Sequence, residues 1–516
     1  MSTGDAEPTS TDRSSNAARW ILVAIITSFW VCRLPVMLRQ IPAQDEDYFA
    51  VPGWTILQTG LPSIPYLPSR DETAAFYRAD DLLYALPPLY FYSQAAVYAV
   101  TGPGTGAARV ASALAGTLTI WAVYALGRVW LPRRGDALWA AALFAWSRVF
   151  YFPCVIARPD MLCGLFGVLS LLTASWWWTS GRLRWLIAAA AAIGGGFLTH
   201  PFAIVFALQV GLWSLCRGPS WFTRLRDATV LTTVALLVAA LWIPLILVDP
   251  DLFVTQFGNN VFNKAGAGVL SRLLWPIESL RVQWPLFVEH TGPLQVILLT
   301  VSSGVAVARV DLVRTEWKRP VLLLATVGLY LHIALQGTHP TKGYWVYTLV
   351  PGFLLAGSLL SRLTLRTGGA AAVGPVRFTA AALLAAALLL PGAGVRTLLA
   401  HLRHWNDTAY NAPAFTQELL SNTPSDGVQV VDPGYAFEFH LAGRKTLLGL
   451  NFPFFYDVSD ERYHLLVAGP TSLRDGVPAA LEAEYQRSFG DKADLFACYS
   501  ELYTAPPHRR PVMESH

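Results

Sequence analysis

Three consecutive carboxylates, Asp45, Glu46 and Asp47, follow shortly after the first long apolar run, which ends at Leu38. Hydrophobic residues make up 54% of the chain and charged residues only 14%, so acids beside an apolar run are unusual here. Crowded carboxylates next to a membrane segment repel one another and lose hydration. This arrangement costs free energy and therefore usually reflects a function. We interpret Asp45 as a candidate catalytic carboxylate and Glu46 as its catalytic neighbour. The alternative is that all three acids begin a solvated loop.

A further acid and a cation occur in Arg158-Pro159-Asp160, directly before the apolar run at 161–179. A sugar donor with a phosphate leaving group needs a carboxylate to deprotonate or orient the acceptor, and cations to neutralise the departing phosphate. Asp160 is therefore a second catalytic candidate, and Arg158 a candidate for binding the donor phosphate. The alternatives are a helix-capping role for Asp160 and an interfacial anchor role for Arg158.

His200 lies in the turn Thr199-His200-Pro201 between two apolar runs, and the glycines at 194–196 before it allow close helix packing. We include His200 among the candidates for the donor phosphate. A lone histidine at a turn is more often a hydrogen-bonding residue than a ligand. A divalent metal is an open alternative, for which Glu46 and His200 would have to meet as ligands.

The loop at 337–344 supplies two more cation candidates, His339 and Lys342, and leads into an apolar run that contains Tyr344 and Tyr347. Cations beside aromatic hydroxyls suit a phosphate or a sugar. We assign Lys342 to the donor phosphate, and His339 with the two tyrosines to substrate binding. The alternative for Lys342 is a side chain that only extends from a helix end to the membrane surface.

The elements that position these residues are membrane helices. The chain has 516 residues and a mean hydropathy of +0.41, and its apolar runs are close to the length of about 20 residues that crosses a bilayer. The sequence therefore predicts a mainly α, polytopic integral membrane protein. The five cysteines are odd in number and mostly lie in apolar runs, so they indicate no disulfide framework. The net charge of +4 gives no indication of nucleic acid as a partner.

We expect about eleven spans and a disordered cytoplasmic tail at 1–18, which lacks the basic segment and cleavage site of a signal peptide. The membrane domain then covers 19–399. The apolar runs are 20–38, 107–130, 135–153, 161–179, 184–199, 201–217, 228–248, 291–310, 320–337, 344–362 and 376–399.

Basic residues in every second connection fix the expected orientation, because basic loops stay on the cytoplasmic side. Arginines at 133–134, 182–184, 217–226, 309–319 and 362–366 follow this rule if the N-terminus is cytoplasmic. The loop at 39–106 and all the candidate residues then lie on the outer face. The apolar segment at 86–100 is too short to span, and we expect it to be an interfacial helix that begins at Pro87 and Pro88.

The composition changes after residue 400. Segments 427–432 and 463–468 are typical of short buried strands, and helices are expected near 413–421, 435–442 and 478–485. We therefore predict that 400–516 is a small extracytoplasmic α/β domain. It would cover the active site, help to bind the acceptor, or only stabilise the fold.

The order of these motifs resembles the lipid-linked-sugar glycosyltransferases of the GT-C fold, above all the branch with protein O-mannosyltransferases and the bacterial aminoarabinose transferase of lipid A. The resemblance covers residues 19–365. It is carried by the acidic pair, Pro-Pro-Leu-Tyr at 87–90, Ala-Arg-Val-Ala-Ser-Ala-Leu at 108–114, Arg158-Pro159-Asp160 and Leu-Thr-His-Pro at 198–201. The chain departs from it at Ala85 and Leu86, where relatives often have a lysine.

The resemblance implies a polyprenyl-phosphate sugar donor and an inverting transfer of a hexosyl or pentosyl group to a lipid, glycan or protein acceptor. It makes Asp45 the base, Asp160 the second acid and His200 a residue near the donor phosphate. It places the enzyme in a bacterial inner or plasma membrane, among cell-envelope proteins with a periplasmic active site. The alternative class is a transporter or flippase of lipid-linked sugar, whose ionisable residues should lie at mid-membrane depth and whose halves should repeat.

Overall fold

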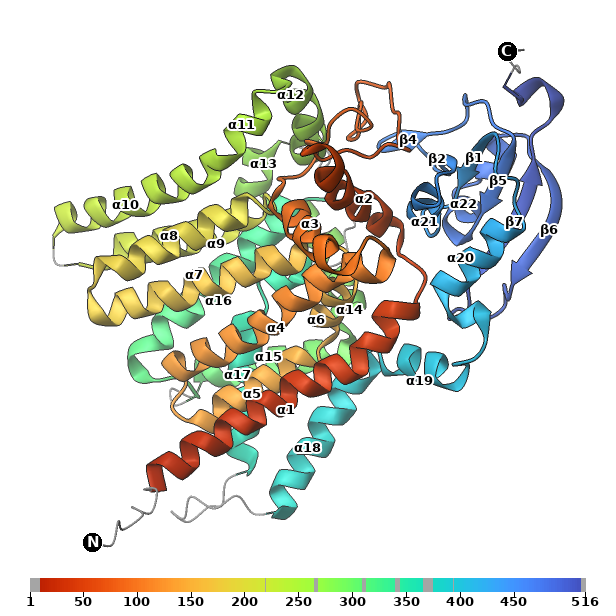
Figure 1. The fold of residues 1–516 in the computed structure, drawn as a ribbon. Coiled ribbons are helices and arrows are strands. Elements are labelled where there is room, and N and C mark those ends of the chain that lie inside the picture. The colour runs from red at the N-terminus through yellow and green to blue at the C-terminus, as the bar shows by residue number, and fades with distance from the viewer. Residues whose placement is uncertain are drawn as a thin grey trace, which may run out of the picture.

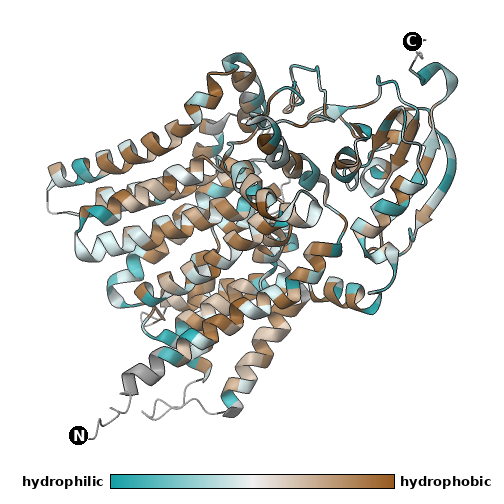
Figure 2. Ribbon diagram, in the orientation of Figure 1, coloured by the Kyte–Doolittle hydropathy of each residue, from teal (hydrophilic) through white to brown (hydrophobic). Residues whose placement is uncertain are grey.

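The structure is a computed structural model that describes residues 10–218, 220–263, 268–308, 312–338, 344–364, 375–392 and 394–511. Long helices lie side by side in one bundle, and a smaller part with a mixed sheet adjoins one end of it (Figure 1). Hydrophobic residues run along the helices of the bundle (Figure 2), as a membrane domain requires. The predicted fold class, mainly helical with a small C-terminal α/β domain, is confirmed.

In the described part of the chain, five helices are long and apolar enough to cross a membrane, or seven if two bent helix pairs each form one span. Four shorter apolar helices accompany them. Each predicted apolar run is mostly helical. The helices of the bundle are α1 (Ser10–Arg39), α4 (Thr105–Trp130), α5 (Arg134–Ala145), α6 (Arg148–Val155), α7 (Asp160–Ser180), α8 (Leu183–Phe197), α9 (Ala203–Cys216), α10 (Trp221–Ala239), α11 (Ile243–Ile246), α14 (Ile277–Thr291), α15 (Pro293–Ala308), α16 (Lys318–Gln336), α17 (Val350–Thr364) and α18 (Pro375–Leu389).

The first helix starts earlier than predicted. Helix α1 begins at Ser10, so it includes part of the segment that we expected to be a disordered tail, while residues 1–9 lie outside the described part. The bent pairs are α5 with α6, at 59°, and α14 with α15, at 107°. The first of these bends leaves α6 at the same end of the bundle as the loop that carries Arg158.

Two short helices, α2 (Gln44–Thr59) and α3 (Leu89–Thr101), pack on each other at this end of the bundle (Figure 1). Helix α3 starts directly after Pro87-Pro88 and has 13 residues, fewer than the roughly 20 that a span needs. The backbone N–H of Ala43 donates to the Glu46 carboxylate at 2.8 Å, and this bond caps the N-terminus of α2. Asp45, Glu46 and Asp47 thus lie in a first helical turn, where acids are favourable. Helices α12 (Pro250–Gly258) and α13 (Val269–Leu274) lie farther along the chain.

The C-terminal part contains a five-stranded sheet of order β2-β1-β5-β7-β6. Strands β1, β2 and β5 are parallel, whereas β7 runs antiparallel to β5 and β6. Both predicted strands are present, as β1 and β5. The elements are α19 (Val395–Arg403), α20 (Ala412–Ser421), β1 (Val428–Val431), α21 (Ala436–Leu441), β2 (Lys445–Leu448), β3 (Asn451–Phe452), β4 (Tyr456–Asp457), β5 (Leu465–Ala468), α22 (Pro470–Arg474), α23 (Val477–Ala480), β6 (Glu484–Gly490) and β7 (Tyr499–Thr504).

One predicted helix of this part is largely wrong. The expected helix near 478–485 is only the short α23, and the chain enters strand β6 at Glu484. The strand is exposed along most of its length, so it lacks the alternation of buried and exposed residues that predicts a strand from sequence.

The loop at 39–106 and the C-terminal part share one hydrophobic core. Tyr48 of α2 packs against Phe76 at 5.1 Å and Phe455 at 5.8 Å between ring centroids. The same buried cluster continues through the sheet residues Val430 and Leu466. The predicted domains 19–399 and 400–516 are therefore joined through the loop at 39–106, and the C-terminal part holds that loop in place.

The orientation of the bundle leads to a test. Glu72 in the loop at 39–106 and Arg182 between α7 and α8 are both exposed. In a Cys216→Ser background, Glu72→Cys should react with an impermeant maleimide added to intact cells, and Arg182→Cys should react only after permeabilisation, because positive connections stay inside. Labelling of both positions from one side would contradict the predicted orientation.

Candidate functional site

Arg158 joins the two predicted catalytic aspartates. Its Nε donates to Asp160 at 2.7 Å, and its Nη1 is paired with Asp45. Asp45 lies at the start of α2, whereas Asp160 is the first residue of α7. Two carboxylates separated by 115 positions in the sequence therefore meet on one guanidinium, whose planar fork can hold a separate partner at each nitrogen.

The two carboxylates differ in access to solvent. The side chain of Asp45 is 37% exposed, whereas the side chain of Asp160 is fully buried. Asp160 also accepts a hydrogen bond from the hydroxyl of Tyr347 at 3.1 Å. Both oxygens of Asp160 are thus engaged, and Asp45 is the acid that an incoming molecule can reach. Burial alone would lower the pKa of Arg158, but the carboxylates of Asp160 and Asp45 raise it above its ordinary value.

Glu46 is held in a different network. Arg109 of α4 grips it with two parallel hydrogen bonds, Nε to Oε1 at 2.7 Å and Nη2 to Oε2 at 2.9 Å. The backbone N–H of Ala157 donates to the same carboxylate at 2.8 Å. Both side chains are 2% exposed. The geometry favours a structural role for Glu46 over the catalytic role predicted from its position.

Asp47 points away from both networks, toward the C-terminal part. Its Oδ1 accepts the backbone N–H of Phe437 at 3.0 Å, and its backbone carbonyl accepts the hydroxyl of Tyr66 at 2.9 Å. Burial raises the pKa of Asp47 well above its ordinary range, although the hydrogen bond from Phe437 opposes this rise. The three consecutive acids therefore have three different surroundings.

Aromatic side chains line the centre next to the starts of α9 and α17. The His200 ring lies 5.2 Å from the Tyr344 ring and 5.9 Å from the Tyr347 ring, between centroids. Its Nδ1 accepts the backbone N–H of Phe202 at 3.2 Å, so this nitrogen carries no proton. Tyr344 also accepts a hydrogen bond from Arg158. Of the predicted site residues, Asp45, Arg158, Asp160, His200, Tyr344 and Tyr347 therefore lie together.

Two predicted site residues, His339 and Lys342, lie outside the described residues. Arg109 belongs to the Ala-Arg-Val-Ala-Ser-Ala-Leu motif at 108–114, from which we predict no role in the site. A buried arginine inside an otherwise apolar helix is a signal that could have identified it, since such a charge needs a partner. Phe437 contributes only its backbone N–H, for which no sequence signal exists.

The possible metal ligands among the described residues do not form a metal site. Within those residues, no three side chains of His, Cys, Asp or Glu come together as a metal site would need. Glu46 and His200 were the predicted ligands. The Glu46 oxygens are both engaged by Arg109, and His200 uses one ring nitrogen for a backbone N–H.

The fold is similar to that of several membrane proteins of known structure. ArnT from Cupriavidus metallidurans aligns at 15% identity over 96% of this chain and 99% of its own, with a TM-score of 0.60. Its complex with undecaprenyl phosphate aligns at 17% identity over 96% and 99%, with a TM-score of 0.57. The oligosaccharyltransferase AglB from Archaeoglobus fulgidus, in complex with an inhibitory peptide and a dolichol-phosphate, aligns at 13% identity over 97% and 75%, with a TM-score of 0.55.

Nearly the whole chain thus has the GT-C fold that the order of its motifs predicts. Residues 85–247 match the model of the dolichyl-phosphate-mannose-protein mannosyltransferase family. No curated protein sequence matches the chain.

The buried pair of Glu46 and Arg109 gives a stability prediction. Glu46→Ala leaves a guanidinium buried without its counter-ion, so we expect the free energy of unfolding to fall by about 3–5 kcal/mol. Unfolding of the purified protein in detergent would measure this change. Glu72→Ala, in an exposed part of the same loop, should have little effect. A Glu46→Ala protein of normal stability but without activity would instead restore the catalytic role of Glu46.

Proposed function

We propose that this protein transfers a sugar from a polyprenyl-phosphate donor to a lipid, glycan or protein acceptor on the outer face of the membrane, with inversion at the anomeric carbon. The observation that carries the proposal is the geometry of Asp45. One of its oxygens is held by Arg158, while its side chain is 37% exposed at the end of an apolar bundle. A carboxylate that is both fixed and reachable suits a general base.

In the proposed reaction, Asp45 accepts the proton of an acceptor hydroxyl or amine as that group attacks the anomeric carbon. The bond from this carbon to the phosphate oxygen breaks, and the polyprenyl phosphate leaves with the electron pair. The proton stays on Asp45 until it passes to solvent. The exposed edge of Asp45 provides a route for that last step.

Arg158 has two tasks in this proposal. It fixes Asp45 relative to α7 through Asp160, and it supplies positive charge beside the position where the phosphate departs. Asp160 acts through Arg158 because both of its oxygens are engaged and its side chain is fully buried. His200, Tyr344 and Tyr347 form the wall on which the sugar would rest. Lys342 and His339 keep their predicted roles in binding the phosphate and the substrate.

The outer-face location rests on the orientation inferred from the basic connections. Helix α2, whose first turn carries Asp45, Glu46 and Asp47, lies at the end of the bundle where the C-terminal part is attached (Figure 1). This arrangement favours an enzyme over the alternative of a transporter, which needs ionisable groups midway across the membrane.

The role of Asp45 can be tested with one substitution. Asp45→Asn keeps the size and most hydrogen bonding but removes the basicity, so release of polyprenyl phosphate from a labelled polyprenyl-phosphate sugar should fall by about 10²-fold or more. The folded yield should not change, because this side chain is partly exposed and is not part of the core. Asp81→Asn is a matched control, since Asp81 is an exposed acid of the same loop that pairs with Arg78. Undiminished release by a folded Asp45→Asn protein would remove Asp45 as the base.

Arg158→Lys tests whether Arg158 positions Asp45 or only anchors its segment at the membrane interface. Lysine keeps the charge but cannot hold Asp45 and Asp160 with a planar fork. Loss of one charge-assisted hydrogen bond of about 1.5–3 kcal/mol should lower turnover per folded molecule by roughly 10- to 100-fold. Arg158→Ala should also lose folded protein, because it leaves buried Asp160 without a counter-charge. Normal turnover in Arg158→Lys would mean that Arg158 is only an anchor.

A further inference from the structure

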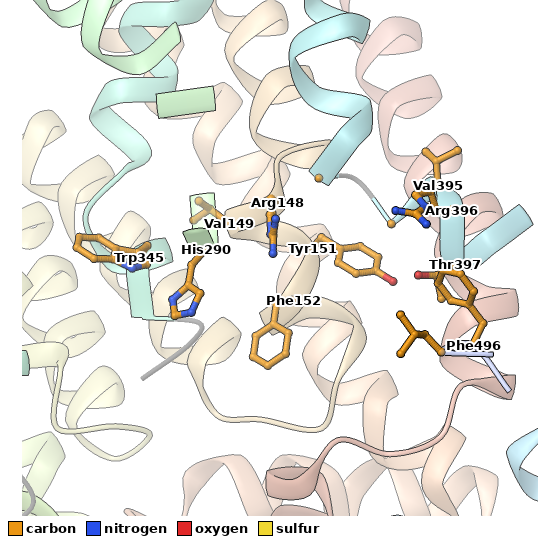
Figure 3. A pocket seen from close by; sticks show the side chains of 13 residues that line it. Arg148, Val149, Tyr151, Phe152, His290, Trp345, Val395, Arg396, Thr397 and Phe496 are labelled. Atoms are coloured by element: carbon orange, nitrogen blue, oxygen red, sulfur yellow. The ribbon is translucent and has the colours of Figure 1, made fainter. Parts of the chain in front are cut away.

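A cavity of about 370 Å³ lies beside the catalytic centre and is used by none of the steps above. It is bounded by α6, the end of α14, the turn between α18 and α19, and the loop before β7 of the C-terminal part (Figure 3). Phe152 lines this cavity and also lies 5.9 Å, from its ring centroid, from the guanidinium of Arg158. The cavity and the centre are thus separated by one aromatic side chain.

Two arginines line the cavity, Arg148 from α6 and Arg396 from α19. Among the described residues, neither guanidinium is paired with a carboxylate. Asp494, which precedes the lining residue Leu495 in the sequence, accepts the hydroxyl of Tyr410 and the backbone N–H of Phe496. A third guanidinium, that of Arg33, lies 4.4 Å from the ring centroid of Tyr151, which also lines the cavity. The residues that line the cavity thus include two arginines and no carboxylate.

Two glycines allow two walls of the cavity, α6 and the turn between α18 and α19, to pack closely. A Cβ at Gly392 would lie 2.6 Å from the Cβ of Arg148, and one at Gly394 would lie 2.2 Å from the Tyr151 ring. Gly394 also has a φ of +70°, which favours glycine. The turn between α18 and α19 can lie directly on α6 only because both positions lack a side chain. This close approach brings Arg396 to the same cavity as Arg148.

The rest of the lining is apolar or aromatic. Trp345 is buried there, Val149 and Phe152 come from α6, and Leu495 is 95% exposed at the rim. A free inorganic ion would leave these surfaces uncovered, whereas an amphiphile would cover them and present its charged group to the arginines. Arginine binds phosphate oxygens with paired N–H groups.

We propose that this cavity binds the phosphate group of a membrane lipid through Arg148 and Arg396, as a site separate from the centre of Asp45, Arg158 and Asp160. The inference goes beyond the proposed glycosyl transfer and is tested by binding alone. The lipid would contact the membrane helices and the C-terminal part at the same time. Its binding would therefore couple these two parts beside the aromatic wall of Arg158.

The test uses the full chain in phosphatidylcholine nanodiscs. A Leu495→Cys variant in a Cys216→Ser background carries a benzophenone at the rim, and the probe is dioctanoyl phosphatidic acid. We expect saturable photocrosslinking to this lipid and none above background to dioctanoyl phosphatidylcholine. Adding Arg148→Gln and Arg396→Gln together should raise the half-saturating concentration at least about tenfold, because charge-assisted hydrogen bonds are lost.

Matched variants keep the result interpretable. Arg184→Gln with Arg281→Gln removes two exposed arginines that do not line the cavity and should leave the half-saturating concentration unchanged. Arg148→Lys with Arg396→Lys keeps both charges and should retain part of the affinity. If misfolding caused the loss in the double Gln variant, the double Lys variant would lose its affinity as well. Equal crosslinking to both lipids, or no change in the double Gln variant, would overturn the proposal. Displacement by inorganic phosphate at concentrations comparable with the lipid would overturn the lipid as occupant and identify soluble phosphate instead.

Discussion

The ion pair between Glu46 and Arg109 is the interaction on which the geometry of the centre depends. Besides its two bonds to Glu46, Arg109 donates from Nη1 to the carbonyls of Met37 at 2.6 Å and Gln40 at 2.9 Å, at the end of α1. Glu46 in turn accepts the N–H of Ala157. One buried pair thus fixes α1, α2, α4 and the loop before α7 relative to one another. Asp45 and Arg158 are each the direct sequence neighbour of a residue in this network, which places them within reach of each other.

The C-terminal part completes the same end of the molecule through helix α21. The backbone N–H of Phe437 donates to Asp47, and Glu438 accepts both the backbone N–H of Thr105 at 2.8 Å and its hydroxyl at 2.9 Å. A short helix of the C-terminal part therefore contacts the first turns of α2 and α4. Because α2 carries Asp45 and α4 carries Arg109, this part of the chain helps to fix the position of the proposed catalytic base.

Much of this organisation could be predicted from sequence, because membrane helices are specified by long apolar runs that need no partner to be recognised. The gathering of Asp45, Arg158, His200 and Tyr347 followed from placing their loops on one side. The different contacts that Asp45, Glu46 and Asp47 make could not be predicted. Consecutive residues of a helix point in different directions, so each acid meets a different neighbour. Those neighbours, Arg158, Arg109 and Phe437, come from distant segments. Strand β6 was missed because its pairing with β7, and not its own pattern, makes it a strand.

The centre combines a buried and a reachable carboxylate on one guanidinium, and the asymmetry has a physical consequence. A base that was fully buried would be excluded from the acceptor, whereas a fully solvated one would sample many rotamers and would need to be ordered for each turnover. Arg158 orders Asp45 from one side and leaves its other side open. The guanidinium can do so because Asp160, which is buried and bonded to Tyr347, holds it from the opposite direction. Removal of the buried acid should therefore disturb the reachable one without touching the substrate.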